Sequence, residues 1–199
     1  MTLLFIALFL LQVQPAHSGP VLNNAFVRVM RNAAPCASGA AGCGDRVIIA
    51  LGPLNWSDGI MKRGDVRVIP AGQSYRPPAA GEFLEVSIKP GHPQVAPPPA
   101  GTPAAPDNKV LFDAKDFTIF EEKMQPGEIS SRHSHNQRVA IFLNDTMVEQ
   151  WTDGKDETRE LEPDLVTFRP AVIHISKDVG KVPIQNLLIE FKPAGRANP

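Results

Sequence analysis

The sequence predicts an all-β protein made of two similar units. Short apolar or alternating segments of strand length recur along the chain, and turn residues separate them. The 20 prolines and 15 glycines among 199 residues favour turns and strands over helices. The second half of the chain repeats the pattern of the first, which predicts two units of one kind.

The first half contains four segments with strand character, at residues 21–31, 46–51, 65–69 and 82–89. Residues 46–51 are almost wholly apolar after the first arginine, which is typical of a strand buried on both faces. Residues 65–69 and 82–89 alternate polar and apolar side chains, as half-buried strands do. A Pro-Ala-Gly turn at 70–72 follows the third segment.

The second half carries the same segments in the same order. Residues 137–143 match 45–51, and residues 187–193 match 83–90. The spacing between matched segments widens along the chain, as expected if the second copy has longer hairpins. One such hairpin is predicted by the Asp-Gly turn at 153–154, which lies between two alternating segments.

A proline-rich segment separates the two copies. Seven prolines lie within residues 90–108, among alanines and glycines and with almost no large apolar side chain. Such a composition predicts an extended, semi-rigid linker. We therefore expect one domain at 19–89 and a second at 109–199.

The first 18 residues have the pattern of a secretory signal peptide. An apolar run at 3–13 is too short to span about 30 Å of hydrocarbon as a helix. A small-x-small pattern at 16–18 suits cleavage before Gly19, so a secreted or periplasmic protein is expected, without stable membrane insertion after cleavage. No lysine or arginine precedes the run, and an uncleaved membrane anchor is the alternative.

Two cysteines, Cys36 and Cys43, lie in a loop of small residues. Export permits disulfides, and we expect these two to form one. A metal-binding pair is the alternative, although no histidine lies nearby to complete such a site.

The net charge of −1 gives no basic surface for nucleic acid and no acidic tail. We expect no nucleic-acid partner. A small-molecule ligand or substrate is the expected partner instead.

Three of the five histidines form a pattern that suits a metal site. His133 and His135 are one residue apart, so they point to the same face if that stretch is a strand. His174 follows Pro170 at the end of a later strand and can close a pocket of three imidazoles. Gln137 has the same parity as the first two histidines, and its amide oxygen is a candidate weak ligand.

These residues resemble the two motifs of the cupin superfamily. Gly127, five residues and then His133-Ser134-His135 fit the opening half of the first motif. In the first copy, residues 64–72 fit the second motif, but Ser74-Tyr75 stands where the histidine belongs. In the second copy, residues 162–174 lack the glycines of that motif but retain His174.

The resemblance implies two jelly-roll (double-stranded β-helix) cupin barrels in tandem, which is the bicupin arrangement. The first copy has Ala41-Gly42-Cys43 opposite His133-Ser134-His135, so only the second is expected to bind metal. The second copy has Arg138 at the place of the motif's glutamate, and arginine cannot ligate a metal. Two barrels in one chain can pack as a pseudo-dimer, so a monomer or a homodimer is expected.

Three imidazoles with open positions suit a divalent transition metal: Zn, Fe, Mn, Ni or Cu. Loss of the carboxylate ligand favours Zn²⁺ or Cu²⁺. The resemblance implies an oxygenase or isomerase that acts on a small organic molecule. Two alternatives stay open: a non-catalytic small-molecule, sugar-binding or structural cupin with a vestigial metal site, and a metal scavenger.

Overall fold

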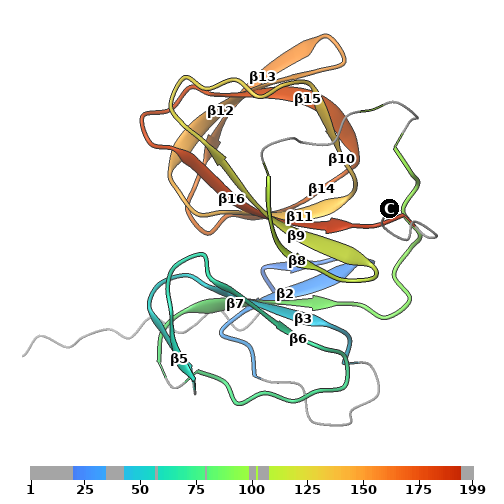
Figure 1. Ribbon diagram of the computed structural model, residues 1–199, viewed down its shortest axis with the longest axis vertical. Helices are drawn as coiled ribbons and strands as arrows, with labels where there is room; N and C mark the ends of the chain where they lie inside the picture. The colour runs from blue at the N-terminus through green and yellow to red at the C-terminus, as the bar shows by residue number, and fades with distance from the viewer. Residues whose placement is uncertain are drawn as a thin grey trace, which may run out of the picture.

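The computed structural model describes residues 20–34, 43–56, 58–78, 80–98, 102 and 108–193. Sixteen strands and no helix lie within these residues, so the all-β prediction is confirmed (Figure 1). Within the same ranges, no helix has the length and apolar character needed to cross a membrane. The predicted signal segment 1–18 and Cys36 lie outside the described residues.

The strands of the first half pair only with one another. They form a five-stranded sheet in the order β1-β2-β7-β3-β6 and a two-stranded sheet of β4 and β5. Their bounds are β1 Leu22–Asn23, β2 Val27–Arg31, β3 Arg46–Ala50, β4 Leu54–Trp56, β5 Gly59–Met61, β6 Val66–Ile69 and β7 Phe83–Ile88.

The strands of the second half form a more complete barrel (Figure 1). One sheet has the order β14-β11-β16-β9-β8, and the other has the order β10-β15-β12-β13. Their bounds are β8 Lys109–Asp113, β9 Phe117–Met124, β10 His133–His135, β11 Arg138–Phe142, β12 Thr146–Thr152, β13 Lys155–Leu161, β14 Val166–Arg169, β15 Val172–Asp178 and β16 Ile184–Phe191.

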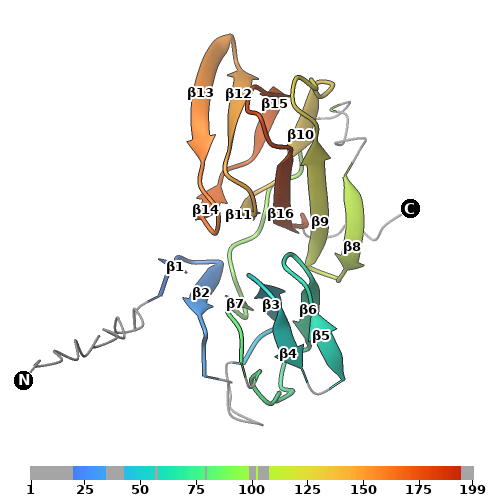
Figure 2. The same ribbon diagram turned by 90° about the vertical axis from the view of Figure 1, so that its left-hand side faces the viewer.

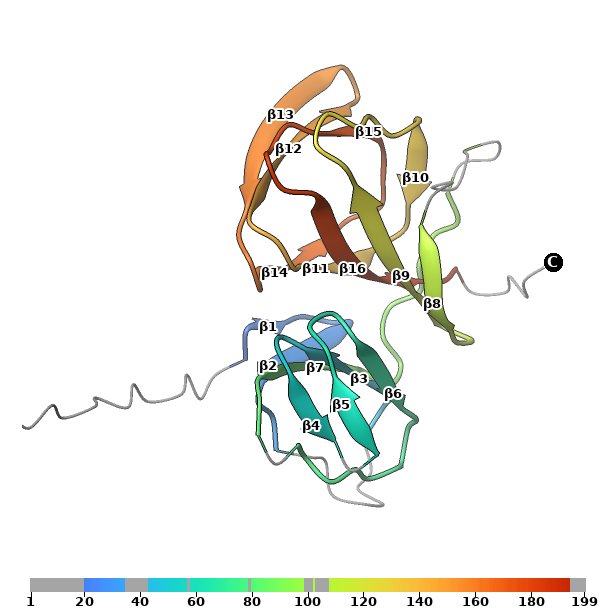
Figure 3. The same cartoon turned by 60° about the vertical axis from the view of Figure 1, so that its left-hand side comes forward.

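The two five-stranded sheets pack on each other through one apolar layer, which we call the shared core. Figures 2 and 3 show the two groups of strands one above the other, with these sheets adjacent. The layer joins residues of β2, β3 and β7 to residues of β9, β11 and β16. Its main members are Val27, Val29, Val47, Ile49, Leu84, Val86, Ile88, Phe117, Ile119, Val139, Ile141, Leu187, Ile189 and Phe191.

Strand alternation gives each of these sheets a second buried face. In β11, Val139 and Ile141 join the shared core, whereas Ala140 and Phe142 belong to a separate apolar cluster inside the barrel. A strand buried on both faces has a continuous apolar run in its sequence, which is the pattern from which burial on both faces was predicted for residues 46–51. The same alternation directs Arg138 into the barrel, where the candidate site lies.

One feature of the first half differs from the prediction. The strand expected at 21–31 is a hairpin of β1 and β2, because the Asn24 side chain accepts hydrogen bonds from the backbone N–H groups of Phe26 and Val27 and forms a turn. In the segment expected as an extended linker, Val95 is buried in the shared core and His92 stacks on Phe26. The predicted domain limits stay a prediction.

Candidate metal centre

Strand pairing brings the three histidines together. His133 and His135 lie on β10, and His174 lies on the antiparallel neighbour β15. The register places His133 directly opposite His174, and alternation places His135 on the same face. All three are buried, with exposed fractions of 1%, 4% and 5% for His133, His135 and His174.

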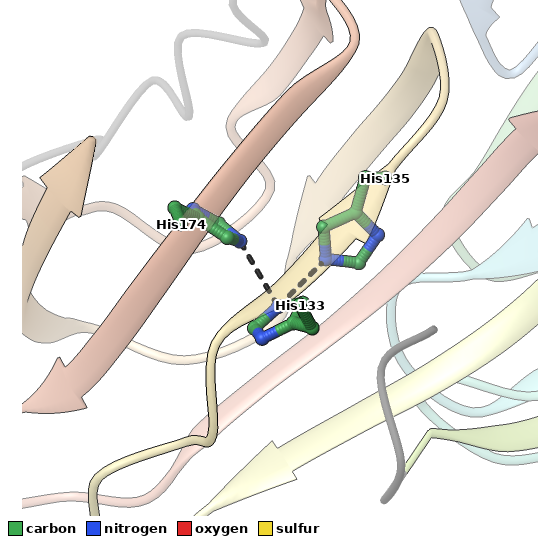
Figure 4. A group of neighbouring side chains, drawn as sticks. All are labelled: His133, His135 and His174. Atoms are coloured by element: carbon green, nitrogen blue, oxygen red, sulfur yellow. Dashed lines mark hydrogen bonds between the residues drawn. The ribbon is translucent and has the colours of Figure 1, made fainter. Parts of the chain in front are cut away.

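The imidazoles converge through their Nε2 atoms (Figure 4). The Nε2 atom of His133 lies 3.1 Å from that of His135 and 3.0 Å from that of His174. The candidate ligand atoms all lie within 4.8 Å of one another. Two nitrogens bound at about 2.1 Å to one ion at right angles lie about 3.0 Å apart, so the two distances from His133 fit a shared metal ion.

Hydrogen bonds at Nδ1 fix the orientation of two rings. The Nδ1 atom of His133 donates to the carbonyl oxygen of Ser131 at 2.7 Å, and that of His135 donates to a carboxylate oxygen of Glu190 at 2.9 Å. Each ring then presents an Nε2 lone pair to the centre. Such partners on the second ring nitrogen are usual for metal-ligating histidines.

His174 has a different partner. Arg159 donates to the Gln150 Oε1 atom, so the amide nitrogen of Gln150 faces His174 and Ser176. That nitrogen donates to Ser176 Oγ at 2.9 Å and to His174 Nδ1 at 3.0 Å. His174 therefore carries its proton on Nε2, where it donates to His133 Nε2.

Burial favours the neutral forms of His133 and His174. Burial is the main cause that lowers the pKa of His174 to about 2, and repulsion from His133 and His135 adds to it. Burial also lowers the pKa of His133, against the hydrogen bond to the Ser131 carbonyl, which raises it. Neutral imidazole is the form that binds metal.

A cavity of about 250 Å³ adjoins the histidines inside the barrel. One part of its lining is apolar and belongs to the inner cluster of the barrel. The polar lining residues are His135, His174, Gln150, Thr152, Ser176, Asn186, Glu122 and Glu157, together with Arg138, Arg159 and Arg169.

Arg138 projects into this cavity at the place predicted for the motif's glutamate. Its Nη1 atom donates to the carbonyl oxygens of Asn136 and Pro170, at 3.3 and 3.1 Å. Burial lowers the pKa of Arg138 to about 10, so it remains cationic at neutral pH.

Gln137 lies in a bend between β10 and β11. The bend interrupts the alternation on which its candidacy rested, and its side chain is not part of the cavity lining. Gln137 as a fourth ligand stays a prediction. In the first half, Ala41 and Gly42 lie outside the described residues, and so does Cys36, so the disulfide to the buried Cys43 also stays a prediction.

Sequence reasoning missed the residues that support the histidines. Glu190, Gln150 and Arg159 come from three other strands, β16, β12 and β13. Alternation along the hairpin at 147–161 indicates that Gln150 can face inward, but no local pattern pairs it with a histidine. That pairing depends on the register between β12 and β15, in which Gln150 lies opposite Ser176.

Solved structures share this fold. A cupin 2 conserved barrel domain protein from Leptotrichia buccalis is 15% identical with a TM-score of 0.51, and the match covers 86% of each chain. AerE from Microcystis aeruginosa is 16% identical with a TM-score of 0.50, and the match covers 83% of this chain and 86% of that one. No protein-family model and no curated protein sequence matches the chain. The β-sheet architecture and these similarities show that this chain has the cupin fold.

Proposed function

We propose that this protein binds a divalent transition metal through His133, His135 and His174 and holds a small organic molecule beside it. The observation that carries the proposal is the convergence of three buried imidazoles through their Nε2 atoms, with His133 Nε2 3.1 Å from His135 Nε2 and 3.0 Å from His174 Nε2. Neutral imidazole nitrogens gathered in this way are common ligands of a divalent metal. An all-imidazole donor set favours Zn²⁺ or Cu²⁺.

The cavity supports an oxygenase- or isomerase-like activity. A bound divalent cation supplies a Lewis acid that polarises an oxygen of the molecule beside it. The chain itself supplies the apolar lining that excludes water, and Glu122, whose carboxylate accepts from Asn186 at 3.0 Å, is a candidate proton acceptor within the same cavity.

Metal analysis of protein purified without a histidine tag tests the metal site. We expect one equivalent of metal per chain, and we expect a chelator to lower the melting temperature, because a ligand of the folded state raises stability. The triple variant His133→Ala, His135→Ala, His174→Ala should lose both effects. His92→Gln removes a histidine outside the cluster and should keep both, whereas unchanged metal binding in the triple variant would refute the proposal.

A non-catalytic binding protein is the second candidate. The hydrogen bond from Gln150 to His174 Nδ1 favours it, because it places a proton on the nitrogen that would face the metal. In that case the three histidines form a polar wall for an organic ligand. Stability that does not respond to chelator or to added Zn²⁺ would favour this candidate.

We also propose that the chain is exported and that Cys36 and Cys43 form a disulfide. The apolar run at 3–13 and the small residues at 16–18 support export. N-terminal sequencing of the protein from the culture medium or periplasm should begin at Gly19. Thiol labelling of the denatured protein should require prior reduction.

A further inference from the structure

Three arginines from three strands line the same cavity. Arg138 projects from β11, Arg159 from β13 and Arg169 from β14. Burial is the main cause that lowers the pKa of Arg138 and of Arg169, and repulsion from Arg159 adds to it in both. The three guanidinium groups are therefore close enough to repel one another.

Glu122 and Glu190 attract Arg138, and Glu157 attracts Arg169, but none of these carboxylates forms an ion pair with either arginine. Among the described residues, no carboxylate oxygen lies within 4.0 Å of the Arg138 or Arg169 guanidinium. Arg138 donates to backbone carbonyls, and Arg169 donates to Thr167 Oγ1 at 3.1 Å.

Arg159 has buried donors that no protein group within the described residues accepts. Its closest carboxylate, on Glu157, lies 3.8 Å from Nε and belongs to a side chain that is 70% exposed. The Nε and Nη1 atoms of Arg159 are buried, and neither has a hydrogen-bond acceptor in the protein. Buried cationic donors without acceptors are costly, and an anionic ligand removes that cost.

The rest of the cavity lining indicates what is attached to the anion. Five apolar side chains of the inner cluster also line the cavity: Met124, Phe142, Val148, Leu161 and Leu188. A volume of about 250 Å³ equals the liquid volume of about eight water molecules, which suits a small molecule. A free inorganic anion would leave the apolar part of this space unfilled.

We infer that the cavity binds a small organic carboxylate, with the carboxylate group on the arginines and an apolar body on the inner cluster. A planar guanidinium matches the two oxygens of a carboxylate. Gln150 contacts both Arg159 and His174, so a carboxylate on Arg159 lies next to the histidine cluster. The inference deepens the proposed function and rests on it for the role of the cavity as the ligand site.

Thermal shift and calorimetric titration of the full chain test this inference with four probes: hexanoate, benzoate, 1-hexanol and inorganic phosphate. We expect the two carboxylates to raise the melting temperature and to bind at least tenfold more tightly than 1-hexanol or phosphate. Arg159→Gln and Arg169→Gln should each weaken hexanoate binding about tenfold or more, since each removes a charge-assisted hydrogen bond. Arg28→Gln removes an exposed arginine of the first half and should bind hexanoate like the wild type.

Equal or absent shifts with hexanoate and 1-hexanol would overturn the inference, and this comparison needs no variant. Phosphate that binds as tightly as hexanoate would also overturn it, because the apolar lining would then play no part. Each titration is run after chelator treatment and again with added Zn²⁺. Hexanoate binding that persists without metal supports the arginine site even if the metal proposal fails, and metal binding is measured separately without any carboxylate.

Discussion

Gln150 connects the metal-binding and cationic sides of the candidate site. Its amide nitrogen donates to His174 Nδ1, and its oxygen accepts from Arg159. In Gln150→Glu, a carboxylate would accept a proton from His174 Nδ1, and the Nε2 lone pair of His174 would then face the metal. We expect Zn²⁺ affinity to rise about tenfold, the lower end of effects seen for such partners.

Competition with a chromophoric chelator measures this affinity. Gln150→Met is the matched control, because it fills similar space and neither donates nor accepts strongly. It should bind Zn²⁺ more weakly than Gln150→Glu. If Gln150→Glu bound Zn²⁺ no more tightly than Gln150→Met, the result would contradict the tautomer assigned to His174.

Depressed histidine pKa values make the metal-free protein sensitive to mild acid. The pKa values of His133 and His174 lie below the ordinary value of 6.5, so the unfolded chain binds protons that the native chain does not. The stability that this provides is present in full above pH 6.5 and falls as the pH drops below it. The maximum slope is about 1.4 kcal/mol per pH unit for each histidine.

Urea unfolding of chelator-treated protein between pH 7.5 and pH 5 measures that slope. We expect the free energy of unfolding of His174→Gln to fall less steeply with decreasing pH than that of the wild type. The difference in slope should be up to about 1.4 kcal/mol per pH unit, which corresponds to one proton. Identical slopes would show that His174 is protonated equally in the folded and unfolded chains.

At the scale of single strands, the alternating direction of side chains explains which part of the candidate site could be predicted from the sequence. His133 and His135 share a face because β10 is a regular strand through both. The same counting could not be extended to Gln137, because the bend at 136–137 separates two strands that belong to different sheets. Glu190 could not be assigned to His135 either, since the two lie 55 residues apart and meet only through the barrel.

The connection between β15, which carries His174, and β16 depends on one buried carboxylate. Asp178 is fully buried and accepts from the backbone N–H groups of Gly180 at 2.8 Å and Ile184 at 2.9 Å. Asp178→Ala would leave two N–H groups without acceptors, at about 1–3 kcal/mol each. We expect the free energy of unfolding to fall by about 3 kcal/mol.

Chemical denaturation of Asp178→Ala and of Asp145→Ala measures the difference. Asp145 is exposed, so its replacement should change stability by less than about 0.5 kcal/mol. A loss of similar size in both variants would mean that the buried hydrogen bonds of Asp178 contribute little.

At the scale of the whole molecule, the repeat predicted two similar units but not their contact. The apolar run at 46–51 indicates burial on both faces, yet nothing in it specifies that one face meets β9, β11 and β16. Arg63 adds polar contacts across the same boundary, with its Nη2 atom 2.7 Å from the Leu143 carbonyl oxygen and 2.7 Å from Asp164 Oδ1. Such contacts depend on the placement of both sheets.

The shared core should make both halves unfold together. Phe191 is fully buried in it and contacts Phe26 across the boundary, with ring centroids 4.9 Å apart. Phe191→Ala should cost about 3–5 kcal/mol through lost contacts and a residual cavity. The two tryptophans report on the halves separately, since Trp56 lies in β4 and Trp151 in β12.

Fluorescence of Trp56→Phe and Trp151→Phe backgrounds therefore follows one half at a time. We expect the two urea transitions to coincide in the parent backgrounds and to shift by the same amount when Phe191→Ala is added. Because Phe191 belongs to the second half, independent halves would show a shift only where Trp151 is the reporter. A Trp56 signal that stayed in place would show that the shared core does not couple the two halves.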